Sequence, residues 1–225
     1  MRTVVIIPAR FASSRYPGKP LVPLLGKPMI LWVAELSAKA AGFQAVMTSG
    51  RALTGTDRLA EAAEQIEADI FINVQGDEPL VNPSDIIRVG EAKAANIDAV
   101  VNGYSWVSDQ ENPGNVNIPK VITNEADELV YMSRVALPGY KDPDNAPARY
   151  KKQVCIYAFT GDELNAFRKF GRKSELEHCE DIEILRFLEL GKRILMIETQ
   201  PGSLAVDVPE DVAGVELALK RKHGL

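Results

Sequence analysis

Short apolar runs rich in valine and isoleucine alternate along the chain with longer segments in which apolar residues recur every three or four positions. Runs of the first kind predict buried strands, and segments of the second kind predict amphipathic helices. In the first half of the chain the expected strands are 4–7, 44–47 and 70–74, and the expected helices are 29–41, 58–66 and 83–95. This alternation is typical of an α/β protein with a mainly parallel, doubly wound sheet and helices on both faces.

The second half of the pattern is interrupted more often by Asn, Asp and Pro, which mark turns. Residues 139–149 contain two prolines and two aspartates, so we expect an exposed loop there. Ser174 and Glu177 form a capping box for a helix that we expect to end at Gly191. The expected strands are 99–107, 119–122, 129–132, 154–159 and 194–197, and the last helix should begin near Pro209.

The composition narrows the class of protein. A chain of 225 residues, 46% of them hydrophobic, can bury a full core within one domain. A net charge of −5 argues against binding nucleic acid through overall positive charge. The two cysteines, Cys155 and Cys179, provide neither a disulfide framework nor a zinc-binding spacing. We find no signal-peptide pattern and no apolar run of membrane-spanning length, so we expect a cytoplasmic protein without a membrane partner.

Three cations follow the first expected strand in the stretch "PARFASSRYPGK". Open α/β sheets bind ligands just beyond the carboxyl ends of their strands, so Arg10, Arg15 and Lys19 could surround a polyphosphate there. Ala9 and Gly18 would permit a close approach of the backbone. The alternative is a solvated surface loop, which the charge count by itself favours slightly. Neither a Walker A sequence nor a GxGxxG sequence is present.

Carboxylates follow two other expected strands. "INVQGDEPL" places Asp77 and Glu78 at the end of a buried strand, and "LAVDVPEDV" places Asp207 before a helix. Carboxylate oxygens at such a position suit Mg²⁺, which often bridges to phosphates, although each acid could instead cap a turn or a helix. Cations and strand-end acids together favour nucleotidyl transfer, because a leaving pyrophosphate needs positive charge and a metal ion.

The order of several motifs makes this interpretation specific. "IIPARFASSRYPGKPL", "GKPMI", "TGTDRL", "NVQGDEPL", "YMSR", "LEHCEDIEILR" and "VDVPEDV" occur as they do in CMP-sugar synthetases. Over nearly its whole length, the chain most resembles the 3-deoxy-manno-octulosonate (Kdo) cytidylyltransferases. The resemblance implies a fold like that of the nucleotide-diphospho-sugar transferases, with one cytidylyltransferase domain over residues 1–225. It also implies a small antiparallel dimerisation region inserted at about 99–150, and hence a homodimer.

The same resemblance implies an activity that depends on Mg²⁺. The anomeric hydroxyl of a 2-keto-3-deoxy sugar acid would attack the α-phosphate of CTP, and pyrophosphate would leave; the product would serve lipopolysaccharide or capsule assembly. The residues implied for the nucleotide are Arg10, Arg15 and Lys19 at the triphosphate, Pro8 and Ala9 at the cytosine, and Ser49, Gly55, Thr56 and Arg58 around them. The residues implied for Mg²⁺ are Asp77 and Asp207. Gln75 is implied close to the sugar or the ribose, and the residues implied on the sugar side are Arg134, Gln153, Tyr157, Glu180 and Glu183.

Two residues depart from the family pattern on the sugar side. The family usually reads "HLGIYGY" where this chain has "QVCIYAF", so a sugar-facing histidine is replaced by Gln153. It usually reads "LEQLR" where this chain has "IEILR", so a sugar-facing glutamine becomes Ile184. Because a pocket built around hydrogen bonds discriminates strongly, we expect an acceptor that is Kdo-like but modified, such as an 8-amino or deoxy analogue or another ulosonic acid.

The chain is also shorter than the family pattern between Gly42 and Phe43, where another strand and helix would normally stand. A single helix still allows a right-handed crossover from strand 4–7 to strand 44–47. Either the protein has lost this unit or the sequence omits it. Deleting an interior strand would disturb the sheet beside the nucleotide, which favours an omitted stretch.

Two other functions stay open. One is a CMP-sialic-acid-type synthetase, against which the "NVQGDEP" and "GKP" sequences argue. The other is a non-catalytic nucleotide-binding homologue. The presence of Lys19, Asp77 and Asp207 argues against it, whereas the changes at Gln153 and Ile184 argue for it.

Overall fold

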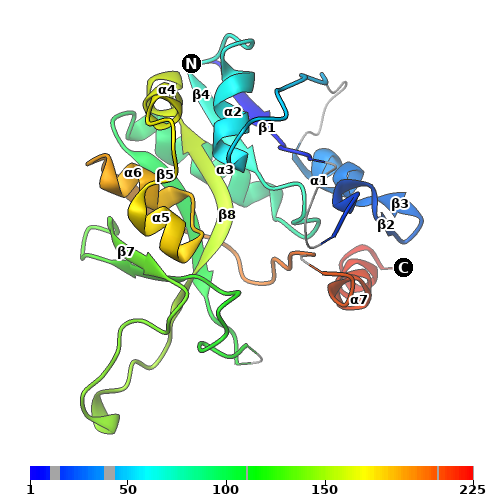
Figure 1. Ribbon diagram of the computed structural model, residues 1–225. Coiled ribbons are helices and arrows are strands. Elements are labelled where there is room, and N and C mark those ends of the chain that lie inside the picture. The colour runs from blue at the N-terminus through cyan, green and yellow to red at the C-terminus, as the bar shows by residue number, and fades with distance from the viewer. Residues whose placement is uncertain (11–15, 38–43, 110, 207, 225) are drawn as a thin grey trace.

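The computed structural model describes residues 1–10, 16–37, 44–109, 111–206 and 208–224 (Figure 1). The main path of its central sheet has the order β1 (Thr3–Ile6), β4 (Ile70–Val74), β8 (Lys151–Phe159), β5 (Val100–Trp106) and β9 (Ile194–Glu198). Four of these strands run in one direction, and β8 is antiparallel to both of its neighbours. The expected mainly parallel sheet is confirmed. β8 is the exception because a loop, and not a crossover helix, leads into it.

Two short strands extend the sheet on one side. β6 (Lys120–Thr123) and β7 (Leu129–Ser133) form an antiparallel pair, and β6 also pairs with the first residues of β8. The segment between β7 and β8 projects away from the body and contains a short 3₁₀ helix, Pro143–Asn145 (Figure 1). Most of its residues are exposed, as the prolines and aspartates predicted.

Helices cover both faces of the sheet because β4 alternates its side chains between two cores. Phe71 faces a core shared with α2 (Gly55–Ala63), α4 (Gly161–Lys169) and α6 (Ile184–Glu189). Ile70, Ile72 and Val74 face a second core shared with α1 (Met29–Ser37) and α3 (Pro83–Ala95). β4 is buried along its whole length between these two layers, which is why it reads as a continuous apolar run.

A third, smaller core joins the two ends of the chain. The hairpin of β2 (Pro23–Leu24) and β3 (Lys27–Pro28) turns through Leu25 and Gly26, both at positive φ. The Trp32 indole N–H of α1 donates to the Leu24 carbonyl at 3.0 Å, and the Leu25 N–H donates to Glu216 of α7 (Asp211–His223) at 2.8 Å. The hairpin, α1 and α7 therefore form one lobe, which we call the α7 lobe (Figure 1).

The structure differs from the sequence-based expectations at three elements. Residues 44–47 form no strand, and Met47 there is 86% exposed, since the segment has too few apolar residues to be buried in the sheet. The helix expected from Ser174 to Gly191 is two helices, α5 (Glu175–Glu180) and α6, because Asp181 between them is in the left-handed conformation.

α4 was not expected at all, although its capping box of Thr160 and Glu163 is legible in the sequence. The end of the expected helix 29–41 lies outside the described residues. None of the helices in the described part of the chain has the length and apolar character needed to cross a membrane.

Candidate active site

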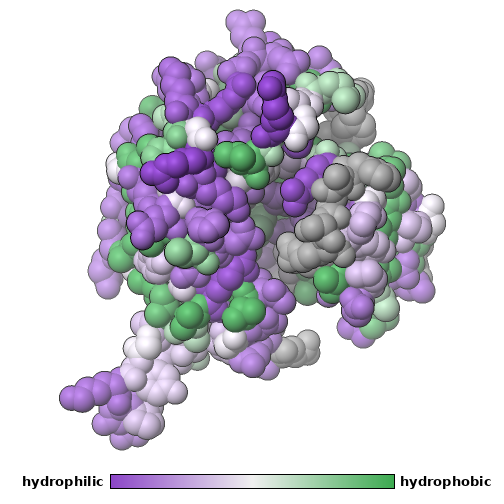
Figure 2. Space-filling view, in the orientation of Figure 1, coloured by the Kyte–Doolittle hydropathy of each residue, from purple (hydrophilic) through white to green (hydrophobic). Residues whose placement is uncertain are grey.

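A cavity of about 400 Å³ opens beyond the carboxyl ends of β1 and β4, between the sheet and the α7 lobe. Figure 2 shows the hollow in this face of the molecule, with mainly hydrophilic residues along the border opposite the α7 lobe. The predicted residues that line it are Pro8, Arg10, Lys19, Gly55, Arg58, Gln75, Asp77, Arg134, Gln153, Tyr157 and Glu183. The fold thus brings together segments from both ends and the middle of the chain at the place expected for an open α/β sheet.

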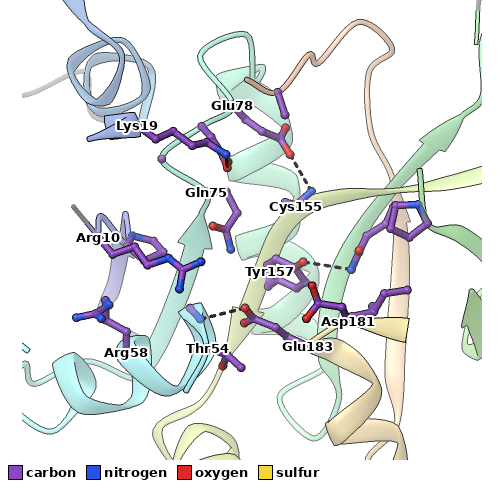
Figure 3. Close-up of a pocket in the computed structure, with 18 of the residues that line it drawn as sticks. Arg10, Lys19, Thr54, Arg58, Gln75, Glu78, Cys155, Tyr157, Asp181 and Glu183 are labelled. Atoms are coloured by element: carbon purple, nitrogen blue, oxygen red, sulfur yellow. Dashed lines mark hydrogen bonds and ion pairs between the residues drawn. The ribbon is translucent and has the colours of Figure 1, made fainter. Parts of the chain in front are cut away.

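One end of the cavity is cationic. Arg10 and Arg58 lie near each other on one side of the close-up (Figure 3). Arg58 stands in the first turn of α2, where its guanidinium donates to the Thr48 hydroxyl at 2.5 Å and to the Ser49 carbonyl. Lys19 begins a 3₁₀ turn after Gly18, and its ammonium lies 2.5 Å from an Asp77 oxygen. Arg15 lies outside the described residues.

The turn that carries Asp77 lies close to the first loop and is hydrogen-bonded to the segment that precedes residue 207. A side chain at Gly76 would bring its Cβ within 3.1 Å of the Pro8 carbonyl and 3.0 Å of Ile30, so glycine allows this turn to approach the first loop. The Val206 N–H donates to the Asp77 carbonyl at 3.0 Å. Asp207 itself is outside the described residues, but its neighbour in the chain is thereby held beside Asp77.

Glu78 connects the same turn to two other segments. Its carboxylate accepts from the Ser203 hydroxyl at 2.5 Å and from the Cys155 N–H at 3.2 Å. Burial raises the pKa of Glu78, although these hydrogen bonds oppose the shift. Glu78 thus links the end of β4 to β8 and to the segment that leads into residue 207.

Glu183 caps the helix that forms another wall. Its carboxylate accepts from the Gly55 N–H at 3.0 Å, the Thr56 N–H at 2.7 Å and the Thr56 hydroxyl at 2.6 Å. A carboxylate is stabilised there because the first N–H groups of a helix carry partial positive charge. The structure therefore brings together three residues that the sequence placed on different sides of the ligand.

The floor of the cavity on the side of β8 is polar and neutral. The Gln153 amide donates to the Tyr157 hydroxyl at 3.1 Å and to Asn102 Oδ1 at 3.0 Å. Asn102 is fixed in turn, because its own amide donates to the Val154 and Ile156 carbonyls. Burial raises the pKa of Tyr157 well above its usual value, so this hydroxyl stays protonated.

Arg134 lines the cavity and contacts Glu180, which lies behind the lining. The Arg134 guanidinium donates to the backbone carbonyls of Glu180, Asp181 and Val116. Glu180 faces β7, where its carboxylate accepts from Tyr131, Ser133 and the Arg134 N–H. Burial acts in the opposite direction, but these hydrogen bonds lower the pKa of Glu180. In this structure both side chains hold protein segments together.

Five predicted residues among those described do not line the cavity: Ala9, Ser49, Thr56, Glu180 and Ile184. Ser49 donates twice to Glu61 at 2.7 Å and lines a separate shallow hollow with Arg168. Ala9 is exposed beside Pro8. Ile184 is 1% exposed and packs in the core with Leu185 and Phe187, so the expectation that it faces a sugar is wrong. The side chain at 184 points into the core because α6 starts there and turns its apolar face to the sheet.

Other residues line the cavity without having been singled out: Thr54, Asn117, Pro119, Cys155, Lys173, Asp181 and Ile182. Thr54 had a detectable signal, since a threonine before "GTD" is a typical helix cap, and its hydroxyl does accept from the Asp57 N–H. The other residues of this group could not be predicted, because no local sequence pattern shows that their segments lie beside the cavity.

Comparison with known proteins identifies relatives along almost the whole chain. A sequence model of the family described as Cytidylyltransferase matches residues 4–39 and 36–194. A 3-deoxy-manno-octulosonate cytidylyltransferase of Geobacter metallireducens is 36% identical over 252 positions, which cover 98% of this chain and 99% of the relative. An 8-amino-3,8-dideoxy-manno-octulosonate cytidylyltransferase of Shewanella frigidimarina is 35% identical, covering 97% of this chain and 99% of that one.

The comparisons also locate the shortening. The two matched pieces of the family model meet at residues 36–39, next to the step from Gly42 to Phe43. The alignment of 252 positions is at least 27 longer than the 225 residues of this chain, as a missing strand and helix would require. Within the described residues, β1 pairs with β4 alone, so no strand occupies its other edge there.

A solved structure agrees over the full length. A CMP:2-keto-3-deoxy-manno-octonic acid synthetase complexed with CTP superposes with a TM-score of 0.89 at 32% identity, covering 99% of this chain and 100% of that one. Agreement of this kind in both sequence and structure, over nearly every element that builds the cavity, places the chain in the family of the 3-deoxy-manno-octulosonate cytidylyltransferases.

Proposed function

We propose that the protein transfers the cytidylyl group of CTP to the anomeric hydroxyl of a 2-keto-3-deoxy sugar acid and releases pyrophosphate. The observation that carries this proposal is the polarity of the cavity. Arg10, Lys19 and Arg58 form one end of it, and the polar, neutral pair of Gln153 and Tyr157 lies across from them. The names of the relatives, and the CTP with which the similar synthetase was solved, support the same reaction.

The chemistry is a single displacement at phosphorus. The acceptor oxygen forms a bond to the α-phosphorus of CTP, the bond from that phosphorus to the α–β bridging oxygen breaks, and the hydroxyl proton goes to solvent or to a base. Negative charge accumulates on the leaving pyrophosphate, so the cations at Arg10 and Lys19 stabilise it. No covalent enzyme intermediate is required, because the acceptor attacks directly.

We further propose that Asp77 and Asp207 hold Mg²⁺. The fit rests on Asp77, which lines the cavity beside Lys19, and on the Val206–Asp77 hydrogen bond that holds the segment before residue 207 next to it. Hard carboxylate oxygens are the donors that this ion prefers. When bound, the ion would add positive charge at the phosphates.

The identity of the acceptor depends on the two positions at which the sequence differs from the family pattern, Gln153 and Ile184. Gln153 does line the cavity, whereas Ile184 carries no argument because it is in the core. We propose Kdo or a close analogue that is altered at the group which meets Gln153. The relative named for the 8-amino sugar makes that analogue the first to compare with Kdo.

We also propose a cytoplasmic homodimer whose interface includes the inserted region at about 99–150. Support comes from large apolar side chains exposed on and near β7, at Val116, Val130, Val135 and Tyr140. Sedimentation equilibrium should give twice the chain mass, and Val130→Lys should shift the mass toward that of one chain. A single-chain mass for the natural protein at micromolar concentration would refute this interface.

Replacing Lys19 tests the reaction. Lys19→Met should lower turnover about 100-fold or more, because the charge beside the leaving group is lost. Pyrophosphate release from CTP, Mg²⁺ and Kdo measures this. Lys27→Met is the matched control, since Lys27 lies on β3 of the same lobe and pairs with Glu35. Full activity of the Lys19 variant would contradict the proposal, and a natural protein that binds CTP without turnover would favour a non-catalytic homologue.

Removing the metal ion tests the proposed role of Mg²⁺. Without Mg²⁺, turnover should stop and CTP should bind more weakly by isothermal titration, because phosphate charge is less well neutralised. Asp77→Asn should weaken the effect of Mg²⁺ on CTP binding. Binding and turnover that are unaffected by a chelator would exclude a role for the ion.

Replacing Gln153 tests the acceptor. Gln153→His restores the residue usual in the family, so preference for Kdo over the modified sugar should rise by roughly tenfold or more. The ratio of kcat/KM for Kdo and for 8-amino-Kdo measures it, with N-acetylneuraminate as a further acceptor. An unchanged ratio would show that Gln153 does not discriminate between the two sugars.

A further inference from the structure

Lys120, at the start of β6, is fully buried, and its three N–H groups all meet backbone. Its ammonium donates to the backbone carbonyls of Asn115, Ile118 and Arg134, and the distances to Asn115 and Arg134 are 2.9 and 2.6 Å. An ammonium has three donors, so these three carbonyls satisfy all of them. Burial and the nearby Arg134 charge lower the pKa of Lys120.

The three carbonyls belong to two segments that border the cavity. Asn115 and Ile118 flank Asn117, which lines the cavity together with Pro119. Arg134 lies after β7 and also lines it. Lys120 thus fixes the loop 115–119 to the end of β7 from behind.

Arg134 continues the same connection toward the opposite segment. Its guanidinium donates to Val116 of the loop at 2.9 Å, and to the Glu180 and Asp181 carbonyls at the end of α5. The turn after α5 brings Asp181, Ile182 and Glu183 to the cavity. Two cations and six backbone carbonyls therefore tie the loop 115–119 to the turn 181–183.

We propose that Lys120 is a positioning residue that sets the shape of the acceptor end of the site and so controls how well the sugar acid binds, without itself touching it. The inference rests on the proposed function, since it assigns this end of the cavity to the sugar. Lys120 serves this role because a buried ammonium can join three carbonyls that no neutral side chain could satisfy at once. The Gln153 N–H donates to the Pro119 carbonyl at 3.0 Å, so the loop is also hydrogen-bonded to the floor of the site.

Removing the Lys120 ammonium should change the loop 115–119 locally and should not destabilise the whole protein. Asn115 and Asn117 are exposed in the single chain, so water can reach this loop once the ammonium is removed. The cationic end of the cavity is built from the first loop and from α2, which Lys120 does not contact. Lys120 is connected to α2 only indirectly, through Arg134 and the turn that carries Glu183, so the effect should be much larger for the acceptor than for CTP.

Lys120→Met provides the test, by steady-state kinetics with CTP and Kdo varied separately. We expect KM for the sugar acid to rise roughly tenfold or more, because small displacements of positioning groups are costly in rate and binding. KM for CTP should stay within about twofold, as should the affinity for CTP measured by titration. Lys120→Gln, which retains two N–H donors, should show an intermediate KM for the sugar and takes over the test if the methionine variant does not fold.

Lys93→Met is the control for loss of a buried lysine. Lys93 is as deeply buried, and it donates to the Ile97 and Ala99 carbonyls and to Glu163, among elements away from the cavity. It should lower thermal stability without separating the two KM values. Equal changes in both KM values, or in neither, for a folded Lys120 variant would overturn the inference. A natural protein that does not turn over the sugar acid would instead overturn the proposed function.

Discussion

The contact between the Lys19 ammonium and the Asp77 carboxylate joins the α7 lobe to the end of the central strand at the cationic end of the cavity, next to the packing of α1 against the sheet. Lys19 belongs to the segment that enters the α7 lobe, and Asp77 ends the central strand β4. The lobe has its own apolar core around Leu24, Trp32 and Leu219. The ion pair is only partly exposed, so water screens it less than it would a surface pair. The geometry of the cationic end therefore depends on how the lobe is held against the sheet.

Several neighbouring contacts hold the turn of Asp77 in place for the ion pair with Lys19. Glycine at 76 lets the turn approach Pro8, and Val206 binds the backbone of Asp77 from the other side. Glu78, one residue on, reaches Ser203 and β8. Three segments that are distant in the sequence are thus connected by a turn of a few residues, which explains why the "NVQGDEP" sequence is so informative.

The other end of the cavity is organised by a different principle. There, the buried Lys120 and the half-buried Arg134 bind backbone carbonyls, and acids such as Glu180 and Glu183 bind protein N–H and hydroxyl groups. Rigid walls of this kind reduce the entropy lost when a ligand binds. The contrast between a charged end and a braced, polar end is what one would expect of a site that receives a triphosphate and a sugar.

Much of this arrangement could be predicted from the sequence, and the remainder could not for physical reasons. β4, α3 and β9 appear as expected because long apolar or periodic segments dominate local structure. The break at Asp181 was missed because a residue in the left-handed conformation inside a helical pattern leaves no apolar signal. Ile184 was assigned to the wrong environment for another reason: the expectation came from the glutamine that the family usually has at this position, whereas the isoleucine at the start of α6 packs in the core. The partners of Arg134 are backbone carbonyls, which carry no sequence identity.

The most direct test of the account is phosphorus NMR of the protein mixed with CTP, Mg²⁺ and Kdo or 8-amino-Kdo. We predict that the three CTP signals disappear and that pyrophosphate and one new phosphodiester appear in equal amounts. This should happen only when the sugar acid is added to the mixture. Formation of CMP or CDP without a phosphodiester, or unchanged CTP in the presence of both sugars, would contradict the central claim that this cavity joins a cytidylyl group to a sugar acid.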